Sequence, residues 1–379
     1  MVPAGGIAAL AFVLFAACAA TSAFAQAESP RTFAGEQVRV TRFASGLENP
    51  WAIAFLPDGR LLVTERAGRM RVVSRDGRVY APIQGIPRVH ASGQGGLLDV
   101  ALDPDFAQSR LVFFSYAEPR ADGAGTAVAR GRLSSDMTRL DDVTVIFRQM
   151  PSGTGNNHFG SRLIFARDGT LFVTLGDRYS LRDKAQDLST TLGKVVRINK
   201  DGSIPADNPF RNTEGARPEI WSYGHRNVQA GAIDPRDGKL WTVEHGARGG
   251  DEVNIPEAGM NYGWPVITYG RDYSGAKIGE GTAKAGMEQP VFYWDPSIAP
   301  SGATFYDAAL FSRWKGSLFV GALAGMSLVR LTVDGDKVTG EERLSLDKRV
   351  RDVRQGPDGA LWLAIDADDG EILRVVPAR

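Results

Sequence analysis

One histidine stands on a loop suited to acid–base chemistry. His158 lies in the segment 155–160, which reads GNNHFG, and directly precedes the apolar stretch 162–165. An unperturbed imidazole titrates near neutral pH, so a histidine with small polar neighbours is a candidate general base. A surface histidine without a role is the alternative that position alone leaves open.

A second polar turn places a permanent cation beside an amide. Arg226 and Asn227 close the segment 223–227, which reads YGHRN. A guanidinium binds a carboxylate through two parallel hydrogen bonds, and the amide adds a donor and an acceptor. The pair is therefore a candidate ligand-binding element, and an arginine that ties two segments together through backbone carbonyls is the alternative. We assign no catalytic role to His225 or His245.

Oxygen-bearing residues gather on loops between positions 246 and 272. Residues 246–254 read GARGGDEVN, residues 261–265 read NYGWP, and Asp272 follows. Carboxylates, amide oxygens and backbone carbonyls at glycine-rich turns are the ligands that calcium prefers. The spacing is not that of an EF-hand, and acidic turn residues that stay solvated are the alternative.

Two arginines alternate with an apolar residue near the C-terminus. Arg349 and Arg351 flank Val350, which places both guanidiniums on one face of an extended strand. That geometry suits a polyanionic ligand, although paired surface arginines are also common. No glycine-rich phosphate loop follows a strand and opens a helix, so nicotinamide and nucleoside triphosphate cofactors are not expected.

These loops need a scaffold, and a repeated motif predicts one. In six places a turn, often Asp-Gly, precedes an apolar β-forming run. The copies begin at Asp58, Ser109, Asp168, Asp237, Lys315 and Asp358. They lie about 40 to 80 residues apart, close to one four-stranded blade plus variable loops. The sequence thus predicts an all-β, six-bladed β-propeller of four-stranded antiparallel blades, whose loops converge at one mouth of the ring.

The two ends of the chain are expected to close this ring. Residues 38–43 alternate apolar and polar side chains and are expected to pair with the strand at 371–376. No segment shows a long helical period, and 44 glycines and 20 prolines supply the turns of such a fold. A β-sandwich or several small barrels is the alternative, but six copies without a linker favour one ring.

The first 25 residues predict a secretory signal peptide, which leaves 26–379 as a single propeller domain. They carry no charge, contain the apolar run 6–17 and end in Ala23-Phe24-Ala25, a small-residue cleavage pattern. The run is too short and too alanine-rich for a membrane span. We expect export to the periplasm, with a lipoprotein anchored at Cys18, the only cysteine, as the alternative.

Charge narrows the range of partners. Lys and Arg together number 44, as do Asp and Glu, so no net field attracts nucleic acid or an anionic membrane. With its one cysteine inside the predicted signal peptide, the exported chain would have no thiolate for an iron–sulfur cluster. The expected partner is a small molecule.

The motifs, in their order along the chain, resemble those of the soluble quinoprotein glucose and aldose sugar dehydrogenases. The resemblance runs from Gly46 to Val353 and is carried by the segments 93–101, 175–177, 223–227, 251–254 and 261–265 together with His158. It implies a six-bladed propeller, monomeric or homodimeric, that binds pyrroloquinoline quinone (PQQ) and calcium. It also implies oxidation of the anomeric hydroxyl of an aldose sugar, with electrons passed to an external acceptor.

The resemblance implies a role for each site residue. His158 would remove the proton of the sugar hydroxyl while a hydride passes to the quinone. Five residues would contact cofactor or substrate: Gln94, Arg226, Asn227, Arg349 and Arg351. The backbone carbonyls of Gly246 and Ala247 would bind the calcium that contacts the quinone. A further, structural calcium site would use Glu252, Tyr262 and Asp272.

Two departures from the family pattern affect this assignment. Family members carry a lysine after the strand near Leu323, where this chain has Ala324, so one cofactor-binding cation is missing. Asn157 precedes the base where glucose-type relatives have aspartate, and an amide gives the imidazolium no charge stabilisation. Two other functions remain open: a calcium-dependent propeller hydrolase such as a lactonase, and a propeller binding module without catalysis.

Overall fold

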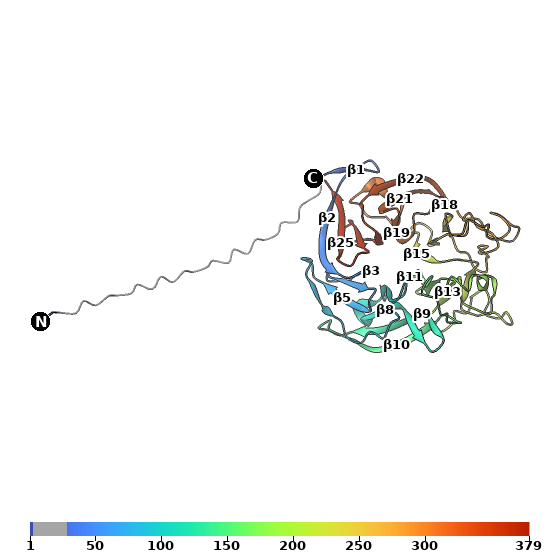
Figure 1. Cartoon of the computed structure of the whole chain (residues 1–379), viewed down its shortest axis with the longest axis horizontal. Helices are drawn as coiled ribbons and strands as arrows, with labels where there is room; N and C mark the ends of the chain where they lie inside the picture. The colour runs from blue at the N-terminus through green and yellow to red at the C-terminus, as the bar shows by residue number, and fades with distance from the viewer. Residues whose placement is uncertain (3–28, 379) are drawn as a thin grey trace.

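The computed structural model describes residues 1–2 and 29–378, and its strands form a closed ring of six antiparallel sheets (Figure 1). Five sheets have four strands each, hydrogen-bonded in sequence order. The sixth has the order β1-β2-β25-β24-β23 and so joins the two ends of the described chain. The predicted six-bladed propeller is confirmed.

The strand bounds follow the ring. The first three blades contain β3 (Pro50–Phe55), β4 (Leu61–Glu65), β5 (Arg69–Val73) and β6 (Val79–Pro82); β7 (Leu97–Leu102), β8 (Leu111–Arg120), β9 (Gly123–Leu133) and β10 (Leu140–Arg148); and β11 (Gly160–Phe165), β12 (Leu171–Leu175), β13 (Lys194–Ile198) and β14 (Ile220–Tyr223). The last three contain β15 (Val228–Ile233), β16 (Leu240–Glu244), β17 (Asp251–Asn254) and β18 (Phe292–Trp294); β19 (Pro300–Phe305), β20 (Leu318–Ala322), β21 (Ser327–Asp334) and β22 (Lys337–Ser345); and β23 (Val350–Gln355), β24 (Leu361–Ile365), β25 (Gly370–Pro377), β2 (Glu36–Leu47) and β1 (Arg31–Phe33). The short helices are α1 (Phe106–Ser109), η1 (Arg182–Gln186) and η2 (Ser312–Trp314).

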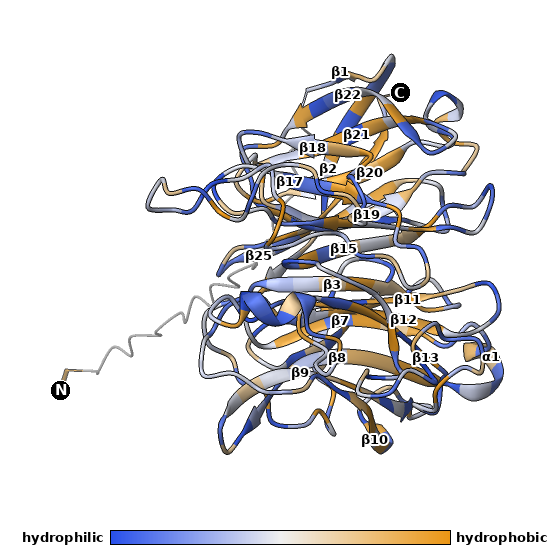
Figure 2. Ribbon diagram, turned by 90° about the vertical axis from the view of Figure 1, so that its right-hand side faces the viewer, coloured by the Kyte–Doolittle hydropathy of each residue, from blue (hydrophilic) through white to orange (hydrophobic). Residues whose placement is uncertain are grey.

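Each copy of the turn-and-strand motif forms the second strand of its blade. Five of these strands, β4, β12, β16, β20 and β24, are buried at every residue. Neighbouring blades cover both faces of each sheet, so the strand is a continuous apolar run without alternation. Figure 2 shows apolar strands inside the blades and polar loops around them. Burial between blades is the main favourable term that holds the ring together.

The ring closes where the sequence predicted. Strand β2 pairs with β25, with Val40 opposite Val375. Strand β1, which was not predicted, adds a fifth strand to this sheet by pairing with β2. The predicted signal-peptide cleavage site and Cys18 lie outside the described residues. Within the part of the chain that is described, no helix is long and apolar enough to cross a membrane.

The innermost strands of the six blades position the site. Strands β3, β7, β11, β15, β19 and β23 contact one another in turn around the centre of the ring. A buried ion cluster joins three of them: Arg162 on β11 lies 2.9 Å from Asp352 on β23 and 3.2 Å from Asp99 on β7. The loops that precede these strands therefore converge on a rigid base.

Candidate active site

His158 sits immediately before the innermost strand β11, as its loop position predicted. The side chain is almost fully buried, and its Nδ1 lies 2.7 Å from Asp177 Oδ1. An ionised carboxylate only accepts hydrogen bonds, so Nδ1 carries the proton and Nε2 keeps its lone pair. The backbone N–H of His158 donates to Gln94 Oε1 over 2.7 Å. The imidazole is thus held in the tautomer that a general base requires.

The carboxylate of Asp177 is itself firmly positioned. Its Oδ2 accepts a hydrogen bond from Trp264 Nε1 over 2.7 Å, and its Oδ1 also accepts one from the backbone N–H of Tyr179 over 2.7 Å. The partner of His158 is therefore Asp177 and not the preceding Asn157, so the amide at position 157 does not deprive the imidazolium of charge stabilisation. This corrects the effect expected from Asn157.

The charges around this pair fix its protonation state. Burial lowers the pKa of His158 from its ordinary value, and the positive charge of Arg226 acts in the same direction, while the hydrogen bond to Asp177 opposes both. Burial alone would raise the pKa of Asp177, but the hydrogen bond from His158 and the charge of Arg226 outweigh it and lower that pKa. At neutral pH the site holds a neutral imidazole beside an ionised carboxylate.

Four of the five predicted cofactor or substrate contacts line one polar cavity. This cavity has a volume of about 610 Å³ at the centre of the mouth, and its walls include Gln94, Asn227, Arg349 and Arg351. Both arginines point to the same carboxylate: their guanidiniums lie 3.2 and 3.0 Å from Asp366 Oδ2. Arg349 and Arg351 thus line the same cavity, but only Arg351 lies within strand β23, and Arg349 precedes it.

The fifth predicted contact, Arg226, lines a smaller cavity of about 270 Å³ together with His158, Ala247 and Asp272. The two cavities lie next to each other, because consecutive residues line them: Arg226 lines the smaller cavity and Asn227 the larger one. The base lines the small cavity, and its backbone N–H donates to Gln94, which lines the large one.

Several buried donors in these walls have no hydrogen-bond partner among the described residues. They are Arg226 Nε, Asn227 Nδ2 and Arg351 Nε. A buried polar group without a partner is costly unless a ligand or water satisfies it. Burial also lowers the pKa of Arg351 from its ordinary value, although Asp366 opposes this effect. The walls are thus suited to a ligand that accepts hydrogen bonds and carries negative charge.

The segment predicted to bind calcium through Gly246 and Ala247 is held by a buried carboxylate. Asp251 Oδ1 accepts from the backbone N–H of Gly246 over 2.8 Å, while its Oδ2 accepts from the N–H groups of Ile298 and Ala299 over 2.8 and 3.0 Å. Ala247 reaches the wall of the smaller cavity. This places the segment beside the base, and its metal-binding role stays a prediction.

The three residues predicted for a structural calcium site make separate contacts. Glu252 is approached by the amide of Asn254 at 3.3 Å, and burial, with repulsion from Glu244, raises its pKa to about 8. Tyr262 donates its hydroxyl to the carbonyl of Ile255, and Asp272 lies 3.5 Å from Arg182. The described residues contain no group of three or more His, Cys, Asp or Glu side chains arranged to hold a metal. The calcium site at these positions remains a prediction.

The side chains of the other two histidines near the site, His225 and His245, form hydrogen bonds within the protein. The His225 ring is fully buried, lies 2.8 Å from Glu244 and stacks on Tyr262. His245 lines the larger cavity, with its Nε2 bonded to the Pro300 carbonyl and its pKa lowered to about 4 by burial. These contacts agree with the absence of a catalytic assignment for either residue.

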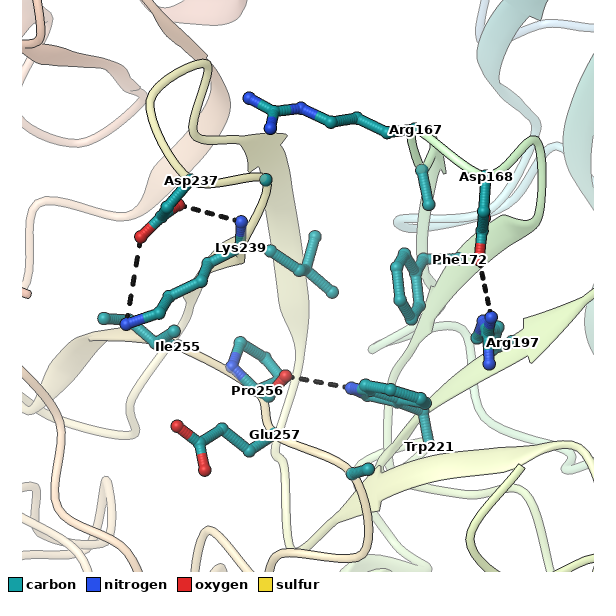
Figure 3. Close-up of a pocket in the computed structure, with 14 residues that line it drawn as sticks. Arg167, Asp168, Phe172, Arg197, Trp221, Asp237, Lys239, Ile255, Pro256 and Glu257 are labelled. Atoms are coloured by element: carbon teal, nitrogen blue, oxygen red, sulfur yellow. Dashed lines mark hydrogen bonds and ion pairs between the residues drawn. The ribbon is translucent and has the colours of Figure 1, made fainter. Parts of the chain in front are cut away.

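A third cavity, of about 430 Å³, lies beside the Asp-Gly turns at the other mouth, between the third and fourth blades (Figure 3). Some of its polar groups are bonded to each other: Asp168 lies 2.7 Å from Arg197, and Trp221 Nε1 donates to the Pro256 carbonyl. None of the predicted site residues lines it. The chemistry predicted from the sequence therefore belongs to the opposite mouth.

Several residues that had no predicted role also belong to the site. Asp177 was part of a matching motif but had no function, and Trp264 and Asp366 complete the contacts of the base and of the arginine pair. Arg66 also lines the larger cavity, where its guanidinium donates to the Gly93 carbonyl and approaches Asn49 Oδ1. Among the described residues Arg66 has no acidic partner, and it lines the chamber whose expected lysine is replaced by Ala324.

Comparisons with known proteins agree on one family. The glucose/sorbosone dehydrogenase family matches residues 47–374. Aldose sugar dehydrogenase YliI of Escherichia coli is 51% identical over 346 residues, which cover 90% of this chain and 93% of that protein.

Solved structures give the same result. The apo form of the soluble aldose sugar dehydrogenase of E. coli is 50% identical, with a TM-score of 0.87 over 90% of this chain and 99% of that chain. The PQQ-bound aldose sugar dehydrogenase of Streptomyces coelicolor is 30% identical, with a TM-score of 0.76 over 92% of this chain and 99% of that chain. This chain therefore belongs to the glucose/sorbosone dehydrogenase family.

Proposed function

We propose that the protein oxidises the anomeric hydroxyl of an aldose sugar to the lactone, with PQQ as the oxidant, calcium as an activating ion and His158 as the general base. The observation that carries the proposal is the His158–Asp177 pair in the small cavity, joined through Gln94 to the wall of the large, arginine-lined one. The relatives described as aldose sugar dehydrogenases, one of them PQQ-bound, support it.

The residues of the larger cavity fit a quinone that carries three carboxylates. Arg349 and Arg351 both pair with one carboxylate, that of Asp366, so one positive charge is left over, and Arg66 adds a third guanidinium. The unpaired donors on Asn227 and Arg351 would then find acceptors on the ligand. The quinone would supply the hydride acceptor when bound, and the carbonyls of Gly246 and Ala247 would hold calcium, which would supply a Lewis acid.

His158 would carry out the proton transfer. Its Nε2 would accept the proton of the anomeric hydroxyl, so that the C–O bond gains double-bond character as the hydrogen at C1 leaves with its electron pair. The imidazolium formed would be stabilised by the negative charge of Asp177, which already accepts a hydrogen bond from Nδ1–H. The sugar loses two hydrogens and becomes a lactone, and His158 returns its proton to water.

We also propose that the protein is exported and that an external acceptor takes up the electrons. The uncharged apolar segment and its small-residue cleavage pattern within residues 1–25 support export. A cofactor that receives two electrons per sugar must be reoxidised before the next turnover, so a partner of suitable potential is required.

The proposal is tested by reconstitution. Purified protein is incubated with PQQ and calcium, with either one alone, or with neither, and dye reduction is followed with a panel of aldoses. We expect dye reduction only when both are present. Sugar oxidation without the quinone, lactone hydrolysis without the quinone, or no quinone binding would each overturn the proposal, and the second result would favour a hydrolase.

A further inference from the structure

A strained turn lies beside the base. Arg178 and Tyr179 follow Asp177 and have backbone φ angles of 57° and 62°, and His158 itself has a φ of 55°. Residues with a Cβ rarely adopt this left-handed conformation, and glycine or asparagine is usual where it is needed. Strain of this kind persists only where the surroundings impose it, and it is common at functional sites. Here it occurs at the base and at two consecutive residues that follow its partner.

The surroundings impose this conformation through several contacts. Asp177 Oδ1, which orients His158, also accepts the backbone N–H of Tyr179 over 2.7 Å. The guanidinium of Arg178 donates to the carbonyls of Asn157 and Gly155 and lies 3.6 Å from the centre of the Phe159 ring. The strained turn and the base are thus fixed by the same carboxylate.

The strained turn places the aromatic ring of Tyr179 beside His158. The Tyr179 ring meets the His158 ring edge-on, with 5.3 Å between centroids and an interplanar angle of 80°. The residue is 48% exposed and lines the smaller cavity. Packing does not explain a tyrosine at this place, because nearly half of it remains in solvent while its backbone is strained.

The rest of this cavity has the chemistry of a site for a cyclic polyol. Tyr273, which is 61% exposed, stands in the same wall as the Arg182 and Asp272 ion pair. A pyranose presents an apolar face of C–H groups and an edge of hydroxyls. Aromatic rings bind the apolar face, and charged groups at the rim accept or donate hydrogen bonds to the hydroxyls.

We propose that the cavity of about 270 Å³ is the sugar subsite and that Tyr179 is its binding platform, on which the C–H face of an aldose rests with its anomeric hydroxyl toward His158 Nε2. This inference rests on the proposed function and deepens it. Tyr179 is a substrate-binding residue that transfers no proton. Its loss is expected to weaken sugar binding and to leave the cofactor site intact.

The proposal is tested with variants of Tyr179, whose positive φ angle suits glycine. Tyr179→Gly removes the ring and relieves the backbone, so a variant that fails to fold is not expected, and its midpoint of thermal unfolding should equal or exceed that of the wild type. Tyr179→Phe keeps the ring without the hydroxyl. Tyr80→Ala, which removes a tyrosine that is 43% exposed on strand β6, is the matched control.

Each variant is reconstituted with PQQ and calcium, the quinone affinity is measured by titration, and kcat and KM are measured with monosaccharides. We expect the KM of Tyr179→Gly to rise about tenfold, while its kcat and its quinone affinity stay near wild-type values. The KM, kcat and quinone affinity of Tyr179→Phe and Tyr80→Ala should all stay near those of the wild type. A wild-type KM in Tyr179→Gly, or a loss of its quinone affinity, would overturn the inference. If the wild-type protein binds quinone but oxidises no sugar, the proposed function fails, and this inference fails with it.

Discussion

The indole nitrogen of Trp264 donates a hydrogen bond to Asp177 Oδ2 over 2.7 Å and leaves Oδ1 to hold His158. The two residues belong to the adjacent third and fourth blades, so the orientation of the base depends on how these blades pack together. An aspartate held in this way keeps the imidazole in one tautomer and stabilises its protonated form. The carboxylate charge should therefore matter more to turnover than to binding.

Asp177→Asn tests this relationship. An amide can donate to Nδ1 and thereby stabilise the wrong tautomer, and it gives the imidazolium no charge. We expect kcat to fall by about 10²- to 10⁴-fold, with quinone affinity unchanged. Asp183→Asn, at an exposed position of η1, should have no effect. Turnover within a few-fold of wild type in Asp177→Asn would show that the pair does not act as described.

His158→Gln removes the base and keeps a polar side chain. Turnover should fall at least about 10²-fold, while the quinone titrates with nearly wild-type affinity, because only proton transfer is lost. His90→Gln, which removes an imidazole that lines neither cavity of the site, is the control. The base assignment is wrong if His158→Gln retains the wild-type rate.

The rate should depend on pH through His158. The base acts in its neutral form, and burial lowers its pKa below the ordinary value of 6.5. The acid limb of kcat/KM should therefore lie below pH 6.5, with activity constant from there toward pH 8. Initial rates in buffers of equal ionic strength measure this. An acid limb centred above pH 6.5 would contradict the environment assigned to the imidazole.

Arg351→Gln tests the anionic character of the ligand. The Arg351 side chain is 12% exposed, against 49% for Arg349, so its charge acts in a less hydrated environment. We expect the dissociation constant of the quinone to rise about 10- to 100-fold in Arg351→Gln and by less in Arg349→Gln. Arg343→Gln, on the exposed strand β22, serves as control. Equal quinone affinity in all three variants would remove the arginine pair from the site.

The buried ion cluster of Arg162, Asp99 and Asp352 should contribute strongly to the free energy of unfolding. Arg162 is buried between Asp99 and Asp352, and Arg162→Met would leave two buried carboxylates with Arg354 as their remaining cation. We expect the free energy of unfolding to fall by about 3–5 kcal/mol. Arg139→Met, which breaks a surface pair, should cost less than about 1 kcal/mol. Urea denaturation of both variants decides whether the cluster is structural.

Most of the fold followed from local sequence patterns. A turn, Asp-Gly in four of the six copies, precedes the second strand of each blade, and that strand was recognisable as an apolar run because neighbouring blades bury it on both faces. Ring closure followed from the alternation at 38–43. Strand β1 was missed because three residues at 31–33 carry too little pattern to predict a strand.

The site was only partly predictable for a physical reason. His158, Arg226 and the pair at 349 and 351 stand next to innermost strands, so their motifs indicated their place. Asp177 lies after the second strand β12, and its pairing with His158 depends on how two loops meet in three dimensions. Arg66 likewise reaches the larger cavity from outside any matching motif.

In the function that we propose, the mouth of the ring that holds His158 removes a hydrogen from C1 of an aldose with a bound quinone. The most direct measurement supplies the reconstituted protein with glucose deuterated at C1 and analyses the product against the dye reduced. We predict one lactone without deuterium at C1 for each two electrons received by the dye, and none when PQQ is omitted. A product that keeps its deuterium, or equal yields without the quinone, would contradict the claim.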